Sequence, residues 1–65
     1  MSCYDASEGT VWRLNRYGSD YVYMLLDCYT TEPWKIRFVL DLVAGRVTIG
    51  FSKGSAFDDE AMRIA

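Results

Sequence analysis

The chain contains no histidine, so cysteine, serine and acidic side chains are the first groups to consider for catalysis. Nucleophilic catalysis by serine or cysteine usually relies on a histidine or lysine base, so the composition argues against it. Arg13, Arg37 and Glu32 are the remaining set that could converge as an active site. A chain of 65 residues leaves little room for a cleft beside its core. We therefore predict that the protein is not an enzyme and uses no cofactor.

The acidic cluster Asp58, Asp59 and Glu60 admits two interpretations. As a group of carboxylates it suggests metal binding or catalysis. However, Ser55 and Asp58 have the S-x-x-D spacing of an N-terminal capping box, and acids in a first turn meet the positive end of the helix dipole. The spacing therefore predicts a capped helix with a solvated acidic face, and no metal site.

Cys3 and Cys28 leave two alternatives open. One is a disulfide or a metal site, but a metal needs three or four ligands, and without histidine only carboxylates could complete the set. The other is that Cys28 is a small buried hydrophobic residue and that Cys3 belongs to a polar N-terminal segment. We expect the second alternative, with residues 1–8 loosely ordered.

Composition limits the class of protein. The chain is 51% hydrophobic and 15% aromatic, which is enough for one small domain over residues 1–65. A net charge of −2 and a pI near 4.8 provide no basic surface for nucleic acid. No stretch approaches the roughly 20 apolar residues that span a bilayer, and the N-terminus lacks the basic and apolar regions of a signal peptide. We therefore expect a cytoplasmic protein that does not enter membranes.

Apolar residues recur at every second position on both sides of a turn at residues 43–46, which is the period of a β-strand. Similar alternation covers residues 9–15 and 21–30. A two-residue loop at Ala44 and Gly45 predicts the cross-strand pairs of the last hairpin. These pairs are Leu42 with Val47, Leu40 with Ile49, and Phe38 with Phe51.

These segments predict an α+β fold, a four-stranded antiparallel β-meander in the order 1-2-3-4 followed by one short C-terminal α-helix packed on one face. The helix has Phe57, Ala61 and Ile64 on one stripe. At about 14 Å it covers only part of a sheet, so the inner face needs further cover, such as a second chain. The predicted inner face consists of Trp12, Leu14, Val22, Met24, Leu26, Cys28, Trp34, Ile36, Phe38, Leu40, Leu42, Val47, Ile49 and Phe51.

The opposite, outer face of the predicted sheet is also rich in aromatic and apolar residues. Tyrosine is enriched in interfaces because it joins apolar area to a polar tip, although it also simply favours strands. We predict a partner-binding surface on this face. Its residues are Tyr21, Tyr23, Leu25, Tyr29, Arg37 and Val39.

The functional prediction is a non-enzymatic protein-binding module, a small inhibitor or adaptor that acts through this aromatic sheet face, with a homodimer as one form. Its size and composition are typical of inhibitors and adaptors, including those of phages and other mobile elements. The alternative is binding of single-stranded nucleic acid, in which bases stack on the tyrosines and nearby basic residues hold phosphates. These basic residues are Arg13, Arg16, Lys35 and Arg37. The negative net charge argues against that alternative.

Overall fold

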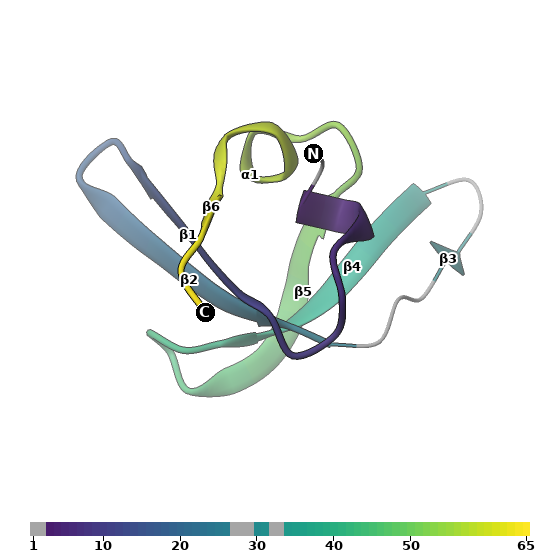
Figure 1. Cartoon of the computed structure of the whole chain (residues 1–65), viewed down its shortest axis with the longest axis horizontal. Helices are drawn as coiled ribbons and strands as arrows, with labels where there is room; N and C mark the ends of the chain where they lie inside the picture. Colours follow the sequence, from purple (N-terminus) through teal and green to yellow (C-terminus); the bar gives the residue numbers. More distant parts are fainter. Residues whose placement is uncertain (1–2, 27–29, 32–33) are drawn as a thin grey trace.

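The computed structural model describes residues 3–26, 30–31 and 34–65. It shows an antiparallel sheet with one short helix, as predicted (Figure 1). The elements are, in chain order, the 3-10 helix η1 (Cys3–Asp5), β1 (Val11–Arg16), β2 (Ser19–Leu25), β3 (Thr30–Thr31), β4 (Trp34–Asp41), β5 (Arg46–Ser52), α1 (Ala56–Glu60) and β6 (Met62–Arg63). The strand order is β6-β1-β2-β4-β5, with β3 also paired to β4. The central strands keep the predicted meander, and the short strands β3 and β6 are additional.

The β4–β5 hairpin is paired two residues away from the predicted register. The observed partners are Leu40 with Val47 and Phe38 with Ile49. Because a shift of two residues preserves the alternation of side chains, these residues still share one face of the sheet. The turn is correspondingly longer and covers residues 42–45.

Asp41 accounts for the longer turn. Its side-chain Oδ1 accepts hydrogen bonds of 2.9 Å from the backbone N–H groups of Val43 and Ala44. Aspartate at the first position of a turn favours this arrangement. Gly45 closes the turn with a φ of 73°, in the left-handed region that glycine adopts without strain.

A β-bulge in β5 separates two residues that the alternation placed on one face. The register shifts between residues 37 and 38, so Gly50 is an extra residue between Ile49 and Phe51. Phe51 therefore joins the face of its partner Arg37 and is buried, whereas Ile49 is exposed. Glycine is required at the bulge because a Cβ on Gly50 would lie 2.6 Å from Cγ1 of Val39.

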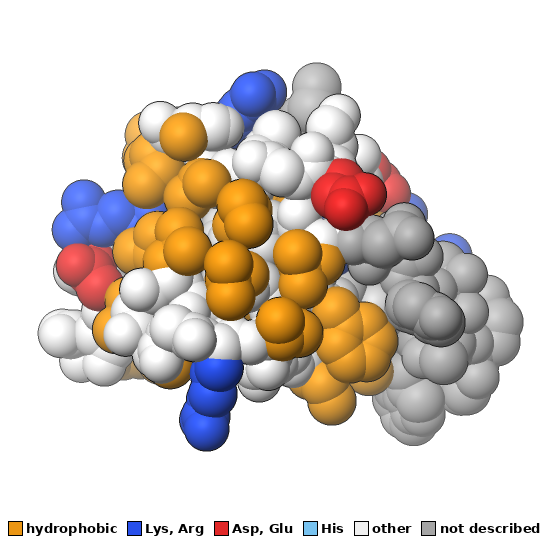
Figure 2. Space-filling model, turned by 90° about the horizontal axis from the view of Figure 1, so that it is seen from below, with side chains coloured by type: hydrophobic (Ala, Val, Ile, Leu, Met, Phe, Trp, Pro, Cys, Tyr) orange, Lys and Arg blue, Asp and Glu red, His pale blue; other side chains and the backbone are white. Residues whose placement is uncertain are grey.

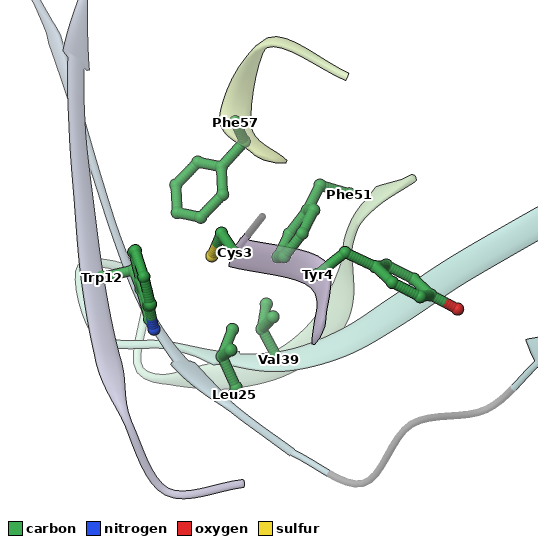
Figure 3. Packing of buried hydrophobic residues seen from close by; sticks show 7 residues of the cluster. All are labelled: Cys3, Tyr4, Trp12, Leu25, Val39, Phe51 and Phe57. Carbon is green, nitrogen blue, oxygen red and sulfur yellow. The ribbon is translucent and has the colours of Figure 1, made fainter. Parts of the chain in front are cut away.

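The core lies on one face of the sheet, beneath η1 and α1. Figure 1 shows both helices between the arm formed by β1 and β2 and the arm formed by β4 and β5. The buried apolar residues are Cys3, Tyr4, Trp12, Leu25, Val39, Phe51 and Phe57 (Figure 3). The predicted assignment of the two faces is therefore wrong for β2 and β4 and for Val47 and Ile49 of β5, whereas Trp12 and Phe51, which were predicted on the inner face, do lie in the core. The face expected to point outward, with Leu25, Arg37 and Val39, is the covered one.

The N-terminal segment is held in place by two buried charged side chains, each 3% exposed. The Tyr4 N–H donates to Oδ1 of Asp58 at 2.7 Å. Nη1 of Arg37 donates to the carbonyl oxygens of Tyr4 and Ala6 at 2.7 and 2.8 Å. Hydrogen bonds with one charged partner are roughly twice as strong as neutral ones. Residues 3–6 are thus packed on the sheet, and Cys3, predicted to lie in a polar N-terminal segment, belongs to the core, whereas Cys28 lies outside the described residues.

The start of α1 confirms the predicted cap. Ser55 is the N-cap residue, and its hydroxyl oxygen accepts a hydrogen bond of 3.4 Å from the Asp58 N–H. The predicted solvation of the acidic face fails at Asp58, which is buried and accepts a second bond, from the Gly54 N–H to Oδ2 at 2.7 Å. Asp58 therefore joins three segments, namely η1, the turn before the helix, and the helix itself.

The end of α1 comes earlier than predicted. The helix has five residues, and the backbone becomes extended at Ala61, with φ −64° and ψ 146°. The chain then forms β6, which pairs with β1. Ile64 consequently leaves the predicted apolar stripe of the helix and is 57% exposed.

The environment of Cys3 gives a testable prediction. Burial, assisted by the negative charge of Asp58 and opposed by Arg37, raises the pKa of the thiol from 9.0 to about 12. A raised pKa in the folded state means that this contribution to stability is present below pH 9 and is lost as the pH rises toward 12. The thiol is free, yet at pH 9 only about a thousandth of it is thiolate, against about half of an exposed cysteine.

We therefore expect iodoacetamide at pH 9 to alkylate Cys3 at least about 100-fold more slowly in the folded chain than in denaturant, because the thiolate is the nucleophile. Peptide mapping by mass spectrometry measures the rate at this residue alone. Equal rates in the two states would show that Cys3 is not buried in η1.

Candidate protein-binding surface

The face of the sheet opposite the core carries apolar side chains that neither η1 nor α1 covers. Strand pairing aligns them in rows across β2, β4 and β5, with Met24, Leu40 and Val47 in one row and Leu26, Phe38 and Ile49 in the next. We call this set the open apolar face. Its members are Val22, Met24, Leu26, Ile36, Phe38, Leu40, Leu42, Val47 and Ile49.

The exposure of this face is greatest at its β5 side. Val47 is 63% exposed, Ile49 61% and Leu42, in the turn, 46%. The other members are half-buried. Figure 2, seen from the side opposite α1, shows apolar side chains gathered in the middle of the surface with charged ones toward its rim.

Among the described residues, the charged side chains on this side of the sheet lie at the border of the open apolar face. On the β1 side it is bordered by Arg13, which pairs with Val22 in the sheet. The guanidinium of Arg13 forms an ion pair of 3.1 Å with Asp20. Contiguous apolar patches on a protein surface mark interaction sites, and depletion of charge is the compositional signal of an interface centre. These properties make the face the strongest candidate binding surface among the described residues.

The alternation in the sequence predicted these residues on the inner face of the sheet, not among the partner-binding residues. The signal that pointed to them was the shortage of cover, since a short helix cannot bury so many apolar side chains. That shortage is observed. The cover that exists lies on the other face, where the N-terminal segment joins α1.

Three of the predicted partner-binding residues lie in the core instead. Leu25 and Val39 are 0% exposed and Arg37 is 3% exposed. Arg37 also donates from Nε to the carbonyl oxygen of Leu26 at 2.9 Å, so its guanidinium forms hydrogen bonds within the folded chain. A partner cannot contact these side chains while the core is intact. Tyr29, a further predicted binding residue, lies outside the described residues.

Tyr21 and Tyr23, the other two predicted binding residues, belong to a row of aromatic rings. The ring centroids of Tyr21 and Tyr23 are 6.4 Å apart, those of Tyr23 and Phe57 4.7 Å, and those of Phe57 and Phe51 4.8 Å. Tyr23 is half-buried by this packing, and burial, with Asp41 and Tyr21 nearby, raises the pKa of its hydroxyl. Tyr21 keeps 43% of its surface exposed, so it alone offers a substantial exposed ring there.

A shallow hollow of about 320 Å³ lies beside these rings, between β2 and the start of α1. Its lining includes Tyr21, Tyr23, Phe51, Phe57 and Ser55. The hollow is open to solvent, and the aromatic side chains that line it already pack against one another.

Three of the four basic residues expected to hold phosphates form other contacts, and the fourth, Lys35, is exposed. Arg13 is paired with Asp20, and Arg16 forms an ion pair of 2.7 Å with Glu60. Arg37 is buried. Stacking of single-stranded bases on aromatic residues depends on free cations for the backbone, so this geometry gives little support to the nucleic-acid alternative.

Within the described ranges, no group of three or more cysteine, aspartate or glutamate side chains lies close enough to hold a metal ion. The helices of the described residues are all too short to cross a membrane. The chain matches no protein-family model, no curated protein and no solved structure.

Proposed function

We propose that this protein is a non-enzymatic protein-binding module whose binding surface is the open apolar face. The observation that supports the proposal is a pair of uncharged cross-strand rows, one from Met24 to Val47 and one from Leu26 to Ile49, which neither η1 nor α1 covers. A sheet packs one face on a core and ordinarily solvates the other with polar side chains. Here the second face is apolar, and burial against a partner removes that area from water at about 25 cal/mol per Å².

A module that binds without chemistry acts by occupying or joining its partner, as inhibitors and adaptors do. The proposed binding surface is therefore the open apolar face, which lies opposite the sheet face that carries Tyr21 and Tyr23. Tyr21 is exposed but lies outside the proposed interface.

Site-specific photo-crosslinking tests the proposal for a partner of any identity. Ile49, 61% exposed on the open apolar face, is replaced by p-benzoylphenylalanine. The matched control carries the same residue in place of Tyr17, which is 90% exposed in the turn between β1 and β2. We expect irradiation of cells that express the chain to give discrete protein adducts from position 49 and few or none from position 17. Equal adduct formation at both positions would refute the assignment of the surface.

A further inference from the structure

The open apolar face has the composition of an interface that is buried permanently. Interfaces of transient complexes are about as polar as the rest of the protein surface, whereas those of homodimers are more apolar. The rows that cross β2, β4 and β5 contain only aliphatic residues, one methionine and one phenylalanine. Val47 and Ile49 would remain more than 60% exposed in a free chain. A partner that is present from synthesis onward removes this exposure, and a second copy of the same chain is always present.

From the proposed protein-binding function, we infer that the occupant of the open apolar face is a second copy of this chain, packed face to face across a two-fold axis. Two sheets stack about 10 Å apart with their side chains interdigitated, as in a β-sandwich. In such a dimer each sheet gains the second apolar layer that it lacks alone. A standard interface buries about 800 Å² per partner, less than a fifth of the 4339 Å² that the chain exposes.

The charges around the face are compatible with self-pairing. A two-fold interface brings a surface patch against itself, so a patch of one sign would repel its own copy. The open apolar face contains no charged residue, and its β1 border carries both signs in the ion pair of Arg13 and Asp20. The chain as a whole has a net charge of −2, which adds only a weak, screened repulsion at physiological salt.

The size of the core supports the same conclusion. The fully covered apolar residues of the described chain come to one small cluster around Leu25 and Val39. Domains near 65 residues are marginally stable alone, and association is one of the usual ways in which they gain stability. Burial of a second apolar layer in a dimer therefore adds stability to a chain that is only marginally stable as a monomer.

Sedimentation equilibrium of the purified chain tests the inference. We expect a mass twice the 7.5 kDa of one chain. Ile49→Lys places a charge in each half of the interface. We expect each of the two charges to lower the affinity of self-association about tenfold, so the variant dimerises about 100-fold more weakly. Tyr17→Lys, a matched exposed substitution away from the face, leaves the dimer unchanged. A monomeric parent, or a dimer that Ile49→Lys does not weaken, overturns the inference.

Thermal unfolding of the unmodified chain provides a second test that needs no variant. The Tm of a dimer rises with protein concentration by mass action, so we expect a higher Tm at higher concentration, and a constant Tm overturns the inference.

The crosslinking at position 49 separates this inference from the proposed function. Adducts of two chains support both, adducts only with a different protein overturn the dimer but keep the protein-binding function, and the absence of adducts overturns both.

Discussion

Leu25→Ala is expected to lower the free energy of unfolding by about 2–5 kcal/mol, the usual cost of removing a leucine side chain from a packed core. Leu25 is 0% exposed and lies among the buried residues beneath η1 and α1 (Figure 3). A small domain has few kcal/mol to lose, so the variant should be largely unfolded at about 37 °C. Denaturant unfolding followed by circular dichroism measures the loss.

Leu40→Ala is the matched control, because it makes the same substitution on the open apolar face. Leu40 is half-buried, so in dilute solution, where chains are apart, the loss should be clearly smaller than for Leu25→Ala. The comparison decides between the two faces of the sheet. If Leu40→Ala proves as costly as Leu25→Ala in the monomer, the assignment of the core to the face of Leu25 is contradicted.

The strands could be predicted from the sequence because alternation is a local property. Apolar residues at every second position from Ile36 to Leu40 and from Val47 to Ile49 gave two correct strands and a correct common face. The shift of two residues in their pairing came from the side chain of Asp41, which lengthened the turn. A shift by two leaves the faces unchanged, so this error did not spread.

The covered face could not be predicted, because alternation does not say which of two apolar faces is buried. β2 carries Val22 and Met24 on one face and Tyr23 and Leu25 on the other. The choice depends on residues far away in sequence, since Tyr4 is 54 positions from its partner Asp58. Nothing local in a polar N-terminal segment indicates such a contact.

One signal in the sequence did favour the observed face. Glycine inside a strand often marks a bulge or a close approach, and Gly50 is both, with Val39 directly against it. The bulge turns Phe51 away from Ile49 and into the core. Strict alternation puts Ile49 and Phe51 on the same face, so it predicts the face of Ile49 as the buried one. For the same reason Leu25, Arg37 and Val39, which are buried, were predicted to point outward.

The largest effect outside the apolar core is expected for Arg37→Ala, at about 3–5 kcal/mol, the range found when one member of a buried charged network is removed. Arg37 is 3% exposed, and its guanidinium donates to the carbonyl oxygens of Leu26, Tyr4 and Ala6. Alanine leaves these acceptors without their donor and removes a positive charge from the neighbourhood of Asp58, which is also buried. Lys35→Ala, an exposed change on the same strand, should have almost no effect. Similar stabilities for the two variants would contradict the role of Arg37.

Arg37→Lys separates the charge of this residue from its geometry. Lysine retains the positive charge but presents a single ammonium group, which cannot reproduce the planar set of donors that bridges β4 to the N-terminal segment. We therefore expect a folded variant in which the amides of residues 3–6 exchange with solvent at least about tenfold faster, while those of β1 and β2 are unchanged. Hydrogen exchange resolved by peptide measures both regions in one experiment. Unchanged exchange at residues 3–6 would mean that the charge alone holds η1 on the sheet, and that the three carbonyl contacts contribute little.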